Sequence, residues 1–101
     1  MAVTPEATPL LINLGLALRS KELAGGVYVI SGHTDITGPA AYNLELSQER
    51  AQSVKRFLVE KFHIDPTTLI AVGYGSEILK NPGNPAGGEN RRVAVAALPT
   101  R

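Results

Sequence analysis

The chain has 101 residues, a length that suits a single domain. Apolar residues make up 44% of the sequence and charged residues 19%, close to the globular average, which excludes a disordered or fibrous chain. Ten Lys and Arg against nine Asp and Glu give a formal charge of +1, a balance that argues against a nucleic-acid binder or electrostatic docking on anionic lipid. The absence of cysteine excludes disulfide bonds, thiolate metal sites and a cysteine nucleophile.

The first predicted element is a helix. Thr4-Pro5-Glu6 has the pattern of a helix start, and Thr8-Pro9 is an alternative start. Gly25-Gly26 is expected to end the helix, with one glycine in the left-handed conformation. The nearly apolar run Pro9–Leu18 is shorter than the roughly 20 residues that a bilayer span needs. Apolar residues at helical spacing predict the buried stripe: Leu10, Leu11, Leu14, Ala17 and Leu18.

The middle of the chain predicts a strand, a loop and a long helix. Val27–Ile30 is β-branched and almost continuously apolar, which is typical of a strand covered on both faces. Ser31–Gly38 is polar and ends in glycine, so we expect a loop there. Pro39 then starts a helix that runs to about Phe62 and is closed by Ile64-Asp65-Pro66.

The last third of the chain predicts two more strands. Leu69–Val72 is a short apolar strand, and Arg92–Leu98 alternates and is rich in strand-forming residues. Between them, Lys80–Glu89 carries three glycines and two prolines, which indicates an irregular loop. The order of elements predicts an α+β fold, a two-layer sandwich of two main helices on a mixed β-sheet, formed by residues 1–101 as one domain.

The long helix carries polar residues on the side that should face the sheet. At about 100° per residue, Asn43, Ser47 and Arg50 fall within a narrow wedge, on the same stripe as the apolar Val54 and Leu58. Polar groups that face a sheet need hydrogen-bond partners. The nearest candidates lie in the preceding loop: His33, Thr34 and Asp35.

Asp35 and Arg50 are therefore expected to face each other across a small cleft at the start of this helix, where backbone N–H groups are also available. One interpretation is a structural ion pair that fixes the loop to the helix. The other is a split pair, held too far apart to neutralise itself. Such a pair suits a zwitterionic ligand, because Asp35 can bind an ammonium group while Arg50 binds a carboxylate. The pattern leaves both interpretations open.

Several motifs together resemble a known family. They are Gly32-His33-Thr34-Asp35, Gly38, Tyr42-Asn43, Leu46-Ser47, Arg50-Ala51, Val54, Gly73-Tyr74-Gly75 and Asn90-Arg91-Arg92-Val93. Across about residues 10–98 the chain resembles the OmpA-like peptidoglycan-binding domain of OmpA, Pal and the C-terminal region of MotB. The resemblance implies a βαβαββ-like order whose first strand is absent here. We therefore expect one exposed sheet edge, and either a chain that is an excerpt of a longer anchored protein or one that is anchored by a partner.

The resemblance implies a protein that binds peptidoglycan non-covalently in the periplasm, without turnover and without a cofactor or metal. It would tether the outer membrane or a membrane complex to the cell wall, with membrane contact only through a segment outside this chain and with no nucleic-acid partner. In the family, the residues that match Asp35 and Arg50 hold the diaminopimelate of the stem peptide. The resemblance extends the ligand-binding set to Thr34, Asn43, Leu44, Arg91 and Arg92.

Two alternative functions stay open. The first is an assembly module that forms a homodimer through the open sheet edge, in which case Arg91 and Arg92 can simply be solvated. The second is a small hydrolase, with His33 and Asp35 as two metal ligands or as an acid/base pair and Ser47 as nucleophile. A metal site needs three or four ligands, and the only other histidine, His63, lies near the far end of the long helix. No nucleophile-elbow or phosphate-loop motif is present, so the hydrolase is the weaker alternative.

Overall fold

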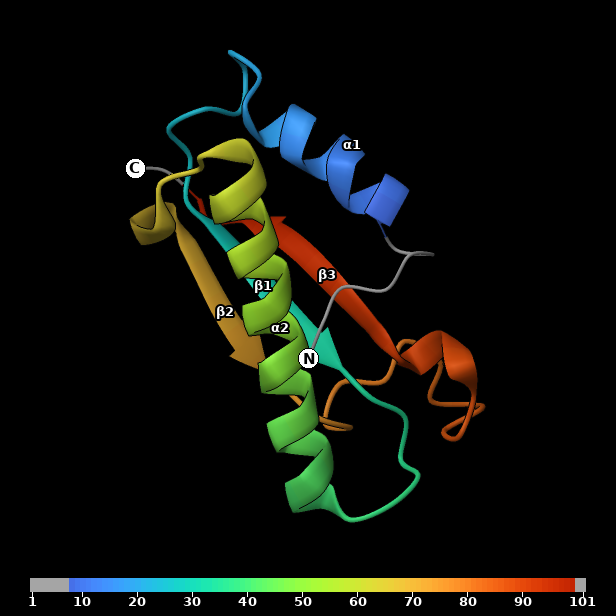
Figure 1. Ribbon diagram of the computed structural model, residues 1–101. Helices are drawn as coiled ribbons and strands as arrows, with labels where there is room; N and C mark the ends of the chain where they lie inside the picture. The colour runs from blue at the N-terminus through green and yellow to red at the C-terminus, as the bar shows by residue number, and fades with distance from the viewer. Residues whose placement is uncertain (1–7, 100–101) are drawn as a thin grey trace.

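The computed structural model of the chain describes residues 8–99. The β-sheet has the strand order β2-β1-β3, in which β1 runs parallel to β2 and antiparallel to β3. Both helices lie on one face of this sheet (Figure 1), which confirms the predicted α+β two-layer sandwich. The elements are α1 (Thr8–Leu18), β1 (Tyr28–His33), α2 (Ala40–Phe62), the 3-10 turn η1 (Pro66–Thr68), β2 (Leu69–Gly73), the 3-10 turn η2 (Gly88–Asn90) and β3 (Arg92–Ala97).

The long helix α2 has the predicted bounds. Pro39 precedes it in an extended conformation, with φ −66° and ψ 137°, so the ring that fixes φ sits where the helix begins. At the other end His63 takes a left-handed conformation at φ 55°, and its N–H donates to the carbonyl of Val59. Asp65 then accepts a hydrogen bond from the N–H of Thr67 and starts η1, so the helix cannot continue.

The hydrophobic core lies between α2 and the strands β1 and β2. Close approach of the helix to the sheet depends on two glycines. A Cβ on Gly32 would lie 2.1 Å from the carbonyl oxygen of Ser47, and a Cβ on Gly73 would lie 2.4 Å from the backbone nitrogen of Gln48. Only glycine permits this spacing, because ordinary contacts begin at 3.4 Å. The buried apolar residues are Leu18, Tyr28, Ile30, Ala51, Val54, Leu58 and Leu69.

Two predictions about β1 were wrong. Ser31, Gly32 and His33 belong to the strand and not to the following loop, because they pair with β3 opposite Ala94, Val93 and Arg92. The strand is also not covered on both faces: both helices lie on the same face, and Val29 and Ser31 are only half-buried. Pairing with distant strands, which no local pattern encodes, decides where β1 ends.

The first helix also ends earlier than predicted. In the described residues α1 spans Thr8–Leu18, and turns follow it up to Gly25, which has a φ of +88°. The chain thus reverses over several residues before β1, with the left-handed glycine at the end of the turns and not at the helix terminus. The first predicted helix start, Thr4-Pro5-Glu6, lies outside the described residues. Neither described helix is long and apolar enough to cross a membrane.

Candidate functional site

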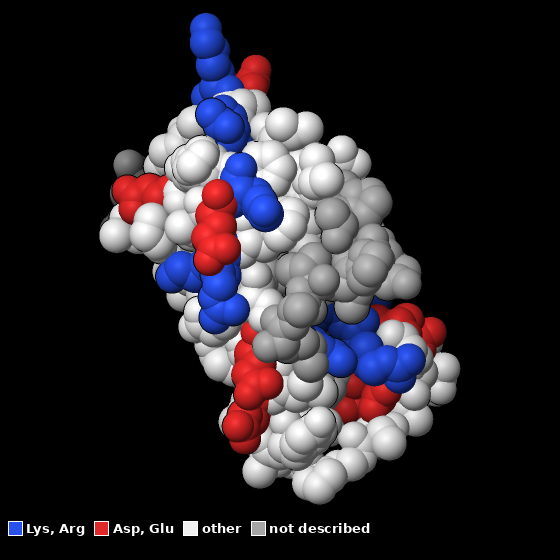
Figure 2. Space-filling model, in the orientation of Figure 1, with Lys and Arg blue, Asp and Glu red and all other residues white. Residues whose placement is uncertain are grey.

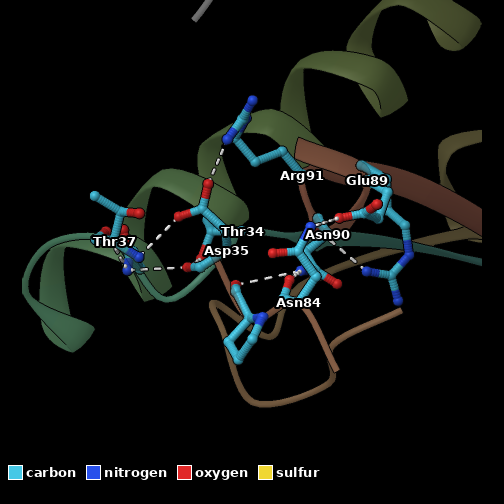
Figure 3. Close-up of polar contacts among 10 residues, drawn as sticks. Thr34, Asp35, Thr37, Asn84, Glu89, Asn90 and Arg91 are labelled. Carbon is cyan, nitrogen blue, oxygen red and sulfur yellow. Dashed lines mark hydrogen bonds and ion pairs between the residues drawn. The ribbon is translucent and has the colours of Figure 1, made fainter. Parts of the chain in front are cut away.

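The loop that joins β1 to α2 holds the carboxylate of Asp35 in a fixed position. One carboxylate oxygen, Oδ1, accepts a hydrogen bond of 2.8 Å from the N–H of Thr37. The other, Oδ2, forms an ion pair with the guanidinium of Arg91 (Figure 3). The Asp35 side chain is only 7% exposed. The Thr37 N–H, and after it the Arg91 side chain, lower the pKa of Asp35 below its usual value, so the carboxylate is charged at neutral pH.

Polar side chains of this region hold the loop itself. Asn43, near the start of α2, donates from Nδ2 to the carbonyl oxygen of Thr37 at 3.0 Å and to that of Asp35 at 3.4 Å. The hydroxyl of Thr34 donates to the same Asp35 carbonyl at 2.8 Å, and the Thr34 N–H donates to the carbonyl of Gly75. Asn43 and Thr34 are both buried. Both side chains therefore shape the loop that presents Asp35.

One turn further along α2, polar side chains fix the segment that follows β2. Ser47 is 0% exposed, and its Oγ accepts from the N–H of Gly75 at 2.8 Å and donates to the carbonyl of Leu44 at 2.7 Å. Gln48 donates to the carbonyl of Ala71 and accepts from the N–H of Gly73. Asn43 and Ser47 thus find partners in the loop before α2 and in the segment after β2, and Gln48 finds them in β2 itself, which fits the expectation that such residues need partners.

A third segment, the loop before β3, brings Arg91 to the same place. Asn90 is 0% exposed, and its side chain accepts from the N–H of Asn81 and donates to the carbonyls of Asn84 and Pro85. Sequence analysis missed this role of Asn90. An asparagine at the end of a loop rich in glycine and proline is the available signal, since asparagine commonly bonds to nearby backbone. Arg92 donates to the carbonyls of Asn90 and Ile78, so it also braces this loop.

His33 is enclosed at the end of β1. Its Nε2 lies 2.9 Å from the Oγ of Ser31, and its ring stacks on Tyr74 with ring centroids 5.5 Å apart. Burial, and then the charge of Arg92, lower the pKa of His33, so the ring is neutral at neutral pH. The prediction of a histidine that takes part in local hydrogen bonding fits this environment, although His33 lies in the strand.

Leu44 lies beside the site with its side chain 47% exposed. It lines a cleft of about 170 Å³ between the first turn of α2 and the segment after β2, together with Ala40, Ala41, Tyr74, Gly75, Ser76 and Glu77. A larger pocket of about 320 Å³ lies at the opposite end of α2, around Phe62 and Tyr28, and none of the predicted site residues lines it.

Arg50 lies on α2 one turn beyond Ser47 and is half-buried. The ion pair that the structure gives to Asp35 is with Arg91, which is 56 residues away in sequence. The arrangement of Asp35 and Arg50 around a ligand stays a prediction. Acidic and basic side chains alternate along the face formed by α2 (Figure 2), so this face has no extended patch of one charge.

Comparison with known proteins identifies the family. The sequence model of the OmpA family matches residues 1–93. The chain belongs to the OmpA family. It is 36% identical to outer membrane protein A of Bordetella avium over 99 residues, which are 96% of this chain and 50% of that protein. The chain spans about half or less of the length of the relatives that it matches in sequence.

Solved structures of this OmpA-family fold agree with the architecture. The peptidoglycan-associated lipoprotein of Burkholderia pseudomallei superposes with a TM-score of 0.77 at 28% identity, covering 96% of this chain and 81% of that one. The cell wall anchor of the type VI secretion system of Pseudomonas aeruginosa gives a TM-score of 0.67 at 31% identity, covering 92% and 66%. These relatives confirm the predicted family and its location in the periplasm and cell envelope, at the outer membrane.

The hydrolase alternative is not supported for this OmpA-family domain. The family and its relatives are structural, wall-associated proteins and not enzymes, as predicted. The geometry agrees, because the Ser47 hydroxyl is fully buried and engaged by Gly75 and Leu44. Within residues 8–99, no group of three or more His, Asp or Glu side chains lies close enough to hold a metal ion.

Proposed function

We propose that this domain binds peptidoglycan non-covalently through the diaminopimelate of the stem peptide and so tethers the outer membrane, or a membrane complex, to the cell wall. The observation that carries the proposal is the buried, charged carboxylate of Asp35 at the end of β1, oriented by the N–H of Thr37. A carboxylate in this setting is an ammonium-binding group, because its charge is maintained and its position is fixed. The names of the relatives point to the same polymer.

In this proposal Asp35 takes the free ammonium group of diaminopimelate and Arg50 takes the neighbouring carboxylate. Thr34 and Asn43 serve the site by holding the loop, as their hydrogen bonds indicate. Leu44 provides apolar contact beside the site, where it is exposed. Arg91 and Arg92, which the family resemblance also includes, supply positive charge on the β3 side.

The test is a calorimetric titration of the domain with a diaminopimelate-containing stem peptide. Asp35→Ala and Arg50→Ala should each lose about 1.5–3 kcal/mol of binding free energy, because each removes a charge-assisted contact. Arg50→Lys should also weaken binding, since a point charge cannot replace the planar fork of the guanidinium. Circular dichroism confirms that each variant is folded. Undiminished binding by folded Asp35→Ala would overturn the assignment.

A homodimer through a sheet edge is the second candidate, and one observation favours it. Within residues 8–99, β3 pairs only with β1, so its outer edge can accept another strand. From Val93 to Ala97 this strand carries no charged residue that would block such pairing. Sedimentation velocity over a range of protein concentrations tests the dimer, and a strict monomer at the highest concentration would exclude it.

A further inference from the structure

Asp35, the carboxylate that is proposed to receive the ligand's ammonium, forms an ion pair with a cation of the chain itself. Arg91 occupies Oδ2 of Asp35, while Oδ1 is bonded to the N–H of Thr37. The two partners differ in exposure: the Asp35 side chain is 7% exposed and the Arg91 side chain 52%. Arg91 is therefore the partner that can leave, because its guanidinium can be solvated without uncovering buried surface.

Movement of Arg91 would be confined to its side chain. The backbone is held on both sides of the residue. Before it, Asn90 is fully buried with three side-chain hydrogen bonds to the loop, and the N–H of Arg91 itself donates to the carbonyl of Gly88. After it, Arg92 pairs with His33 in the sheet. In Figure 3 one guanidinium nitrogen of Arg91 faces Asp35 and another points away from the site. Arg92 cannot act in the same way, because its guanidinium is bonded to two backbone carbonyls.

We propose that Arg91 is a latch that exchanges partners when the ligand binds. The ammonium group of the ligand replaces the guanidinium on Oδ2 of Asp35, and the released guanidinium joins Arg50 on the ligand's carboxylate, whose two oxygens can accept from both arginines. This proposal rests on the proposed function and adds a role for Arg91 that the pairing of Asp35 with Arg50 does not contain. The exchange conserves charge: one ion pair is broken and two are formed, so neither Asp35 nor Arg91 is left without a partner.

The exchange predicts which ligands are selected. A ligand that carries only an ammonium group must displace Arg91 and gives it nothing in return. A ligand with an ammonium and a carboxylate on the same carbon supplies a partner for both groups. The latch therefore discriminates against simple cations, because it makes them compete with an internal guanidinium. Selectivity for the zwitterion should depend on Arg91, and removal of Arg91 should reduce it.

The experiment titrates two stem peptides that differ only in the free carboxylate of diaminopimelate, which is intact in one and amidated in the other. The parent domain should prefer the intact peptide. Arg91→Ala should bind the intact peptide roughly fivefold more weakly, and it should bind the amidated peptide two- to fivefold more tightly because the competitor on Asp35 is gone. Arg91→Lys should show an intermediate preference, since it retains the charge without the fork. Arg56→Ala, an exposed arginine on α2, removes the same charge away from the site.

The latch predicts that Arg91→Ala changes the affinity for the two peptides in opposite directions, which a purely structural role of Arg91 would not do. If Arg91→Ala lowers the affinity for both peptides equally, or changes neither affinity by more than Arg56→Ala does, the latch is refuted while the proposed function stands. If the folded parent domain binds neither peptide, the proposed function itself fails. A folding defect in Arg91→Ala would be detected by circular dichroism, and Arg91→Lys then provides the same comparison.

Discussion

Replacement of Ser47 with Ala is the most direct test of the network that holds the site together. Ser47 is fully buried, and its Oγ is the acceptor for the N–H of Gly75 at 2.8 Å. Without the hydroxyl this N–H is left buried without an acceptor, which costs about 1–3 kcal/mol. Alanine recovers up to about 0.5 kcal/mol through its higher helix propensity. The expected net loss is therefore about 1–2 kcal/mol of unfolding free energy.

Urea denaturation followed by circular dichroism measures this loss. With a urea dependence of about 2 kcal/mol per molar, which is the middle of the range for small domains, the midpoint should fall by about 0.5–1 M. Ser76→Ala, a partly exposed serine just after the same loop, should change the unfolding free energy by less than about 0.5 kcal/mol. Equal midpoints for Ser47→Ala and the parent domain would refute the reasoning, because they would show that the Gly75 N–H does not depend on the hydroxyl.

Three further predictions concern packing and acid stability. Gly32→Ala should lower the unfolding free energy by about 1–3 kcal/mol or more, because its Cβ would meet the Ser47 carbonyl oxygen at 2.1 Å. The control Gly83→Ala should change the unfolding free energy by less than about 1 kcal/mol. Equal urea midpoints for the two variants would contradict the prediction. The pKa of His33 is lowered by burial, so the unfolded chain binds more protons just below pH 6.5 and the domain loses stability there as pH falls. In His33→Gln the melting temperature should fall less between pH 7 and about pH 6 than in the parent domain. An unchanged dependence of melting temperature on pH would contradict the lowered pKa of His33. The pKa of Asp35 is lowered by the backbone N–H that it accepts from and then by its partner guanidinium, so its contribution to stability is present above the unfolded pKa of 3.8 and is lost as pH falls below that value. Asp35→Asn should therefore flatten the melting temperature in acid, and a curve parallel to that of the parent would refute the assignment.

Local signals were enough to predict most elements of the fold. Proline at position 39 and the Asp65-Pro66 pair mark the ends of α2, because proline fixes φ and excludes the helical conformation before it. The strands Leu69–Gly73 and Arg92–Ala97 follow from short runs of apolar and β-branched residues between turn signals. The polar end of β1, Ser31–His33, was missed because its pairing partners lie about 40 and 60 residues further along the chain.

The sequence predicts the polar residues that α2 turns toward the sheet, but it does not predict the contact between Asp35 and the distant Arg91. Asn43 and Ser47 stand out because a helix that faces a sheet should not turn amides and hydroxyls inward, and both are indeed buried and bonded to loop backbone. The ion pair between Asp35 and Arg91 has no such signal, since the two residues meet only through the register of β1 with β3. His33 pairs with Arg92 in that register, which places the residues on either side of this pair next to each other.

The hydrogen bonds of the loop between β1 and α2 keep the Asp35 carboxylate in place during the proposed exchange of partners. Oδ1 of Asp35 is held by a backbone N–H within its own loop, and that loop is tied to α2 by Asn43 and to the segment after β2 through Thr34. None of these contacts involves Arg91. A change of partner at Oδ2 therefore leaves the orientation of the carboxylate intact, so a ligand would meet an acceptor that is already in place. Preorganisation of this kind lowers the cost of ordering the site on binding. It follows that substitutions at Asn43 should weaken a ligand's binding even though the Asn43 amide is engaged by the loop rather than open to the ligand.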